Sequence, residues 1–239
     1  MTRGPQVPFF VIIPSGGDCL ILALGVFMPE VRPLIDRMLV VEKGEELGRS
    51  FHRGIVGNNE VVVSGGFVGK VETAFVTQRL TDRFKPNLAL LLSGAAALDD
   101  SLKPGEIVIG TEFEEYDTVF PLGDRSGVLK APDSLLMRFL RVYYKGARFG
   151  KLVSGDEVVS DNRERVRIAS SSDALALDMD SAAFAKTSQA NGLEYIVIKV
   201  VLDNADENAK ADFDRNFARF CGRPAELIGE VLKTHYIDK

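Results

Sequence analysis

Apolar and polar positions form two recurring patterns along the chain. Short apolar runs, most of them rich in β-branched residues, predict strands, and longer stretches with one apolar face predict helices between them. The expected strands are Cys19–Phe27, Ser50–Val56, Glu60–Gly65, Asn87–Leu92, Glu106–Phe113, Phe149–Val153, Ala174–Leu177 and Tyr195–Leu202. The expected helices are Glu30–Leu39, Val71–Phe84, Asp133–Tyr144, Arg163–Ala169, a helix from Ser181 to Gly192, and Ala211–Thr234 with a break at Gly222 and Pro224.

Strands and helices alternate over the whole length, which predicts one α/β domain with a mostly parallel core sheet. We assign this domain to residues 19–239 and interpret residues 1–18 as an N-terminal extension. The apolar runs Val7–Ile13 and Cys19–Met28 are both shorter than the roughly 18 residues that a membrane span needs.

The segment from Asp173 to Asp206 contains the expected site. It predicts strand, helix and strand, with Asp178 and Asp180 after the first strand and Asp203 after the second. In open α/β sheets, ligands bind beyond the carboxyl ends of parallel strands. These acids are therefore candidate ligand contacts, although any one of them alone is also explained as a helix cap or a solvated loop acid.

Charge and composition narrow the classes of function. The 239-residue chain carries a formal net charge of −5, which argues against a nucleic-acid surface, because such surfaces need clustered basic residues. Cys19 and Cys221 are too few for a disulfide framework, and the small number of histidines, His52 and His235, argues against a histidine metal site or a Ser-His-Asp triad. We therefore expect a cytoplasmic protein with no metal, no cofactor, no nucleic-acid partner and no membrane partner.

Small-residue turns follow two expected strands, at Gly65–Lys70 and Ser93–Ala97. Neither has the spacing of a P-loop or of a dinucleotide-binding turn, and each alone is explained as a tight turn. The order of motifs along the chain is more specific than any one of them. It runs through Met28-Pro29-Glu30-Val31, Ser64-Gly65…Gly69-Lys70, Ser93-Gly94-Ala95-Ala96, Leu102–Val108, Ser154-Gly155-Asp156, Asp178-Met179-Asp180 and Asp203-Asn204-Ala205-Asp206.

This ordered set, over residues 19–234, resembles the purine nucleoside phosphorylase/nucleosidase superfamily, and within it the 5′-methylthioadenosine/S-adenosylhomocysteine nucleosidases. The resemblance implies a three-layer α/β/α sandwich with a mixed, mostly parallel central sheet, usually assembled as a homodimer. It also implies hydrolysis of the N-glycosidic bond between adenine and a 5′-thio-substituted ribose. The small-molecule partner would be a nucleoside, and the role would be in purine and methionine salvage.

The resemblance assigns catalysis to two acids. Asp203 matches the aspartate that protonates N7 of the leaving adenine, and Glu30 matches the glutamate that orients or deprotonates the attacking water. The chemistry needs such a pair, because the purine leaves as an unstable anion while the sugar becomes an oxocarbenium ion. Burial beside Val201 and Leu202 would raise the pKa of Asp203. Glu30 is also explained as an acid in the first turn of a helix.

The resemblance also implies substrate contacts. Met179 and Asp180 match a ribose-binding Met-Glu pair, and Phe213 matches an aromatic residue that stacks on adenine. The other expected contacts are Val158, Val159, Ala95 and Val68. Three residues depart from the family pattern: Asp180 replaces a glutamate, Leu202 a serine before the catalytic aspartate, and Ala95 a serine in the turn. They indicate a divergent subfamily with an altered substrate or a reduced activity.

Water is favoured over phosphate as the nucleophile. A phosphate pocket needs cationic donors, and the phosphorylases that this chain resembles carry arginines at two positions. Leu92 occupies the position of one of these arginines. The motif that contains the other arginine is replaced by Phe27-Met28-Pro29-Glu30, and Arg32 lies one helical turn too late to substitute for it. A purine nucleoside phosphorylase and a non-catalytic nucleoside-binding protein remain as alternatives.

Overall fold

The computed structural model describes residues 19–118 and 127–234. The N-terminal extension predicted for residues 1–18 lies outside the described residues, and so does the middle of the loop predicted for Glu114–Lys130. Within the described ranges, no helix is both long enough and apolar enough to cross a bilayer.

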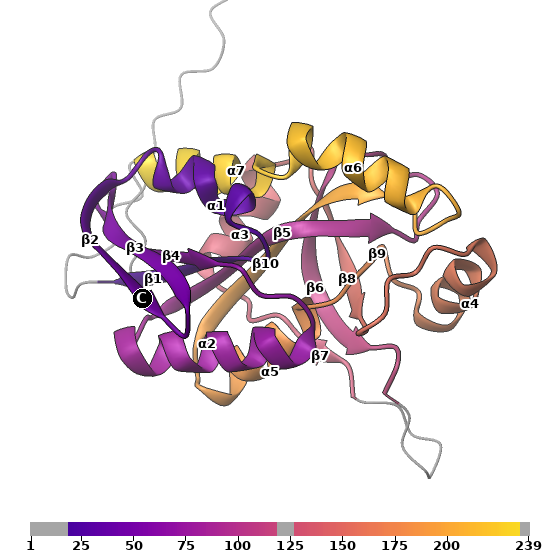
Figure 1. Cartoon of the computed structure of the whole chain (residues 1–239), viewed down its shortest axis with the longest axis horizontal. Helices are drawn as coiled ribbons and strands as arrows, with labels where there is room; N and C mark the ends of the chain where they lie inside the picture. The colour runs from indigo at the N-terminus through magenta and orange to yellow at the C-terminus, as the bar shows by residue number, and fades with distance from the viewer. Residues whose placement is uncertain (1–18, 119–126, 235–239) are drawn as a thin grey trace, which may run out of the picture.

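A mixed sheet forms the centre of the molecule (Figure 1). Its strands are β1 (Leu20–Gly25), β2 (Leu39–Glu46), β3 (Arg49–Val56), β4 (Asn59–Gly65), β5 (Leu88–Ala97), β6 (Ile107–Glu115), β7 (Leu129–Lys130), β8 (Arg148–Ser154), β9 (Ala176–Asp178) and β10 (Glu194–Asp203). The neighbouring strands β4, β1, β5 and β10 run parallel, and β3 and β2 extend the sheet beyond β4 as antiparallel strands. The predicted mixed sheet with a parallel core is confirmed.

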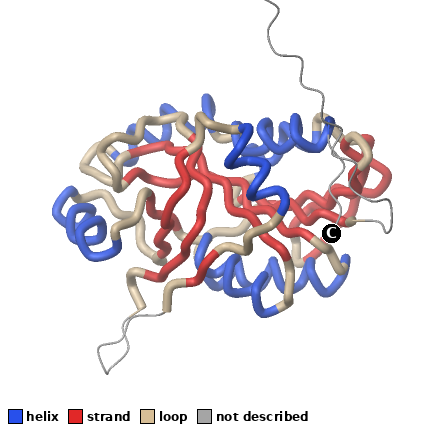
Figure 2. Tube along the Cα trace, turned by 180° about the vertical axis from the view of Figure 1, so that it is seen from behind, coloured by secondary structure: helices blue, strands red, loops and turns tan. Residues whose placement is uncertain are grey.

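Helices cover both faces of this sheet (Figure 1 and Figure 2). They are α1 (Met28–Ile35), α2 (Lys70–Phe84), α3 (Leu135–Tyr143), α4 (Asn162–Ser172), α5 (Ser181–Ala190), α6 (Ala209–Phe220) and α7 (Arg223–Thr234). One apolar core lies under α1, α3 and α7, with α6 packed against it, and a second core lies on the opposite face under α2 and α5. Strand β1 alternates between them, with Ile21 and Ala23 in the first core and Leu22 and Leu24 in the second. The three-layer arrangement is therefore confirmed.

At one side of the molecule the sheet closes on itself. β10 pairs with β5 in parallel and with β6 in the antiparallel sense, while β8 and β9 lead from β6 back to β5. The register of β10 against β5 shifts between Val201 and Asp203, and that of β6 against β8 shifts between Gly110 and Glu112. Such bulges bend strands and allow closure. The sequence pattern does not predict this ring, because periodicity identifies strands but not their partners.

The structure corrects one predicted helix. The helix expected to continue to Leu39 ends at Ile35, and Leu39–Glu46 instead forms β2, which the sequence pattern does not predict. This strand lies at the edge of the sheet, and charged side chains such as Glu42 and Lys43 are exposed along it. Edge strands often carry charges that discourage pairing with another chain, and these charges conceal the strand pattern.

One further boundary differs from the prediction. Strand β5 does not stop at Leu92 but continues through the small residues as far as Ala97, because this stretch pairs with β10 on one side and β9 on the other. The break predicted at Gly222 and Pro224 in the C-terminal helix is confirmed, because two helices, α6 and α7, meet at Gly222. A Cβ atom on Gly222 would lie 2.7 Å from Pro33 Cγ, so the junction packs closely against α1.

Candidate active site

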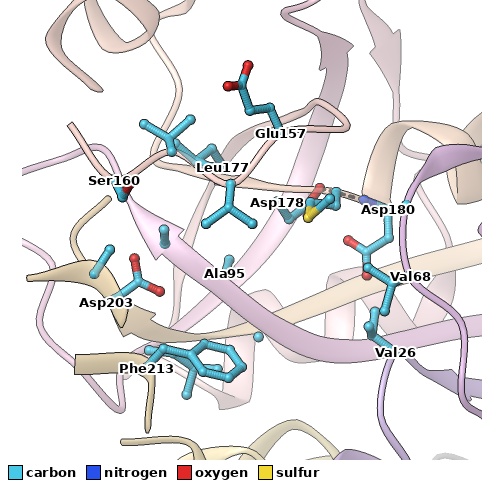
Figure 3. Close-up of a pocket in the computed structure, with 18 of the residues that line it drawn as sticks. Val26, Val68, Ala95, Glu157, Ser160, Leu177, Asp178, Asp180, Asp203 and Phe213 are labelled. Carbon is cyan, nitrogen blue, oxygen red and sulfur yellow. Dashed lines mark hydrogen bonds between the residues drawn. The ribbon is translucent and has the colours of Figure 1, made fainter. Parts of the chain in front are cut away.

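A cavity of about 480 Å³ opens at the carboxyl ends of the parallel strands. Its walls come from the segments after β1, β4, β8 and β9, from the ends of β5 and β10, and from α6. All the residues that the sequence analysis proposes for the site line it: Glu30, Val68, Ala95, Val158, Val159, Met179, Asp180, Asp203 and Phe213. Figure 3 shows Asp203 and Phe213 at one end of the cavity and Asp180, Val68 and Val26 at the other. The roles of these residues remain predictions.

Glu30 is buried, at 1% exposed, and both of its carboxyl oxygens are hydrogen-bonded. One carboxyl oxygen accepts a hydrogen bond from the backbone N–H of Phe27 at 2.7 Å, and the other accepts one from Gly94 at 2.8 Å. Burial raises the pKa of Glu30 to about 8, although these two hydrogen bonds favour the ionised form. The bond to Phe27 caps the first turn of α1, so the structural role considered for Glu30 is real. Glu30 caps the helix and also lines the cavity.

Asp203 ends β10 and is 8% exposed. Its carboxylate accepts a hydrogen bond from the backbone N–H of Ala205 at 2.9 Å, and the carbonyl of Leu202 accepts one from Asn216 of α6 at 2.8 Å. Burial, with smaller contributions from Asp212 and Asp206, raises the pKa of Asp203 to about 6. The carboxyl is thus positioned and partly protonated near neutral pH, as a general acid requires.

Asp180 belongs to a buried ion cluster that the sequence analysis does not predict. The Lys199 ammonium is fully buried and lies 2.5 Å from Asp180 Oδ1, 3.0 Å from Asp178 Oδ2 and 2.6 Å from the Ser93 hydroxyl. Ser93 in turn donates a hydrogen bond to Asp180 Oδ2 at 3.1 Å. Both oxygens of Asp180 are therefore fixed from behind the cavity wall. The one sequence feature that indicates this cluster is a single lysine, Lys199, within the apolar run Tyr195–Leu202.

The two aspartates of this cluster differ in protonation. Burial raises the pKa of Asp180 to about 7, and the nearby Asp178 adds to the effect. Burial also disfavours the charge on Asp178, but Lys199 and hydrogen bonds from Ser154, from the Ser181 hydroxyl and from backbone N–H groups hold the pKa of Asp178 below its usual value. Asp178 therefore stays ionised as the structural partner of Lys199.

An aromatic group forms one wall of the cavity. Phe213 stacks on Phe217 with ring centroids 5.1 Å apart, and Phe217 meets Phe27 edge to face at 5.4 Å. Phe27 and Phe213 both line the cavity, whereas Phe217 supports them. Phe27 is a contact that the sequence analysis does not propose. A flat aromatic surface of this kind suits a purine ring.

Leu202, the departure next to Asp203, occupies space beside Gly94. A Cβ atom on Gly94 would lie 2.3 Å from Leu202 Cδ1. Glycine at this position therefore leaves room for the leucine and lets the Gly94 N–H reach Glu30. The leucine makes the surroundings of Glu30 more apolar, in agreement with the raised pKa of Glu30.

The charges in the cavity wall are mostly acidic. Among the described residues that line the cavity, Lys210 alone is basic, and it lies 2.8 Å from Asp214. Arg32 pairs with Asp36 and does not line the cavity, and Leu92 is fully buried in the core. A phosphate dianion would find no unpaired cationic donor among these residues.

Comparisons with known proteins identify the family of the chain. A family model described as the phosphorylase superfamily matches residues 19–233. A 5′-methylthioadenosine/S-adenosylhomocysteine nucleosidase of Thermotoga maritima is 37% identical over 214 residues, which cover 90% of this chain and 98% of that protein.

Solved structures show the same fold. An S-adenosylhomocysteine nucleosidase of Streptococcus pyogenes, in complex with 5-methylthiotubericidin, gives a TM-score of 0.85 at 20% identity and covers 94% of this chain and 100% of that one. A 5′-methylthioadenosine/S-adenosylhomocysteine nucleosidase of Helicobacter pylori gives 0.80 at 25% identity, with coverage of 92% and 98%. From the family match and the 37% identity over nearly the whole length, the chain belongs to the phosphorylase superfamily and, within it, to the 5′-methylthioadenosine/S-adenosylhomocysteine nucleosidases.

Proposed function

We propose that the protein hydrolyses the N-glycosidic bond of adenosine-type 5′-thio-nucleosides, such as 5′-methylthioadenosine or S-adenosylhomocysteine, and releases adenine. As a member of this family it is an N-glycosyl hydrolase. The observation that carries the mechanism is that two buried carboxyls with raised pKa values, Glu30 and Asp203, line one cavity of about 480 Å³. The substrate class is supported by the family to which the chain belongs. The cytoplasmic location and the role in salvage stay predictions.

The two carboxyls divide the reaction between them. Asp203, beside the aromatic wall, gives its proton to N7 of adenine as the C1′–N9 bond breaks. Glu30, fixed by two backbone N–H groups, accepts the proton of the water that attacks C1′. Each proton transfer by a positioned group contributes roughly 10²–10⁴-fold to the rate.

The sugar is assigned to the end of the cavity that contains Asp180 and Met179. The carboxylate of Asp180 retains lone pairs that can accept a hydrogen bond from a ribose hydroxyl. Lys199 and Ser93 fix the direction of this carboxylate. Water is the nucleophile, because the acidic wall is unfavourable for phosphate.

A single assay tests this function. Purified protein is expected to release adenine from 5′-methylthioadenosine in phosphate-free buffer, at a rate that added phosphate does not increase. Adenine release that depends on phosphate, with formation of a sugar 1-phosphate, would favour the phosphorylase alternative. Nucleosides that raise the melting temperature without any release of base would favour the non-catalytic alternative.

We also propose that the protein is a homodimer, with an interface beside the cavity. Val68 and Val158 line the cavity, Val71 and Phe75 follow Val68 on α2, and all four are exposed to between 46% and 79%. Large exposed apolar side chains that lie close together are typical of protein interfaces. Sedimentation equilibrium should give a dimer for the wild type and a monomer for Phe75→Glu. Val142→Glu is the control, because Val142 is on α3 and is 58% exposed, as Phe75 is at 57%, so this variant should remain a dimer. A monomeric wild type would contradict the proposal.

A further inference from the structure

We propose that Lys70, Asp117 and Asp156 form an ion cluster that positions the two walls of the cavity against each other. The inference rests on the proposed function, because it concerns substrate binding in the same cavity. None of the three side chains lines the cavity, so they act as positioning residues. We refer to them as the Lys70 cluster.

Asp156 connects the loop after β8 to the start of α2. Its Oδ1 accepts a hydrogen bond from the backbone N–H of Lys70 at 2.7 Å, at the first position of that helix. The carboxylate thus caps α2 from a loop 86 residues away in sequence, where the helix dipole also favours a negative charge. Gly69 has a φ of +88°, and a Cβ atom there would lie 3.1 Å from the same oxygen. A glycine at this position permits the close approach.

Lys70 and Asp117 complete the cluster. The Lys70 ammonium lies 2.5 Å from Asp117 Oδ1 and 3.8 Å from Asp156 Oδ2. The other oxygen of Asp117 accepts a hydrogen bond from the backbone N–H of Asp156 at 2.9 Å. Despite partial burial, the contacts with Lys70 and Asp156 hold the pKa of Asp117 below its usual value. Each member therefore contacts the other two.

The cluster joins segments that carry much of the cavity wall. Val68 and Gly69 precede Lys70, and the loop from Glu157 to Ser160 follows Asp156; all of these residues line the cavity. On its other side the same loop is held by Gly155, whose N–H donates to the carbonyl of Asp178 at 3.0 Å. Val159 of the loop is 6% exposed in a small apolar core, and the Tyr116 hydroxyl donates a hydrogen bond to the carbonyl of Glu157 at 3.3 Å. The ion cluster adds the contact that joins this loop to the start of α2.

Loss of the cluster should weaken substrate binding more than catalysis. In the proposed function, the loop from Glu157 to Ser160 and the turn at Val68 and Gly69 contact the substrate. The catalytic carboxyls, Glu30 and Asp203, are held by hydrogen bonds from other segments. Lys70→Gln is expected to raise KM for 5′-methylthioadenosine by about tenfold, with kcat changed less than about threefold, since charged hydrogen bonds in partly buried sites have about this effect. Asp156→Ala should match it, whereas Asp156→Asn should have a smaller effect, because its amide oxygen still accepts from Lys70 N–H.

Lys85→Gln is the matched control, because Lys85 is the C-cap residue at the opposite end of α2 and also pairs with an aspartate, Asp82, at 3.5 Å. Hydrogen–deuterium exchange gives a readout that does not depend on turnover. In Lys70→Gln, exchange should increase in residues 155–160 and around residue 70, while the core strands keep wild-type exchange.

The outcomes separate this inference from the proposed function. An unchanged KM together with unchanged exchange in residues 155–160 would overturn the role of the cluster, as would a fall in kcat alone. Exchange that increases throughout the protein would also overturn it, since the cluster would then support global stability. If the wild type releases no adenine, the proposed function fails while the exchange experiment still tests the cluster.

Discussion

Asp203→Asn is expected to lower kcat/KM for adenine release by about 10³-fold, within the range for loss of a general acid. Asparagine has the same size and can accept the hydrogen bond from Ala205 that Asp203 accepts at 2.9 Å, but it has no acidic proton to transfer to N7. Steady-state release of free base measures the loss. Glu194→Gln is the matched control, because it removes a carboxylate from the exposed start of the same strand and should stay within about twofold of wild type.

Stability measurements distinguish lost chemistry from lost structure. The pKa of Asp203 is raised from 3.8 to about 6 in the folded protein, so the folded state binds a proton more tightly than the unfolded state between these values. Stability therefore falls as pH rises through this window, and the loss is complete above pH 6, up to about 3 kcal/mol. Asp203→Asn does not incur this loss. It should unfold at an equal or higher temperature than wild type at pH 8, and lower stability would contradict the assigned environment.

The pH profile of kcat/KM tests which carboxyl is the acid. The pKa values of about 6 for Asp203 and about 8 for Glu30 predict a rise up to pH 6, a plateau, and a fall above pH 8. The protonated fraction of Asp203 falls above pH 6 while the ionised fraction of Glu30 rises up to pH 8, so the two effects cancel on the plateau. Residual activity of Asp203→Asn should therefore keep rising to pH 8. Residual activity of Asp203→Asn that is flat below pH 8 and falls above it would reverse the two roles.

Asp203 can be found from the local sequence pattern, because it ends a continuous apolar strand. Glu30 is assigned only through the resemblance of its motif to a known family, because its local pattern is equally that of an acid in the first turn of a helix. Their convergence follows from a rule of topology, since the carboxyl ends of parallel strands meet at one edge of the sheet. The notable departure, Leu202, was visible in the sequence, but its contact with Gly94 was not.

Other features depend on partners that lie far apart in the chain. Lys199 lies 106 residues from Ser93 in sequence, and a single lysine in an apolar strand does not reveal which acids surround it. The Lys70 cluster joins residues 47 positions apart through a side-chain ion pair and residues 86 positions apart through a hydrogen bond to a backbone N–H, and neither contact leaves a mark in composition or periodicity. The closure of the sheet likewise depends on strand register rather than on strand pattern.

Lys199→Met is expected to produce the largest loss of stability, because it leaves Asp178 and Asp180 buried without their cation. Removing one partner of a buried ion cluster costs about 3–5 kcal/mol. Methionine has a similar volume, so the loss reflects charge rather than a cavity. Urea unfolding at constant m measures it. Lys186→Met, which removes a lysine that is 41% exposed and 3.0 Å from Glu115, is the control and should cost at most about 1 kcal/mol.

The pH dependence of this loss identifies its cause. Without Lys199, the two aspartates should have folded-state pKa values well above their unfolded values, because each charge is buried beside the other. The folded variant would then retain protons that the unfolded chain releases, so its deficit should grow as pH rises and shrink at pH 5. Adding Asp178→Asn should restore part of the stability at pH 8 by removing one of the two charges. A deficit that is independent of pH, or equal for Lys199→Met and Lys186→Met, would show that packing rather than charge holds Lys199 in place.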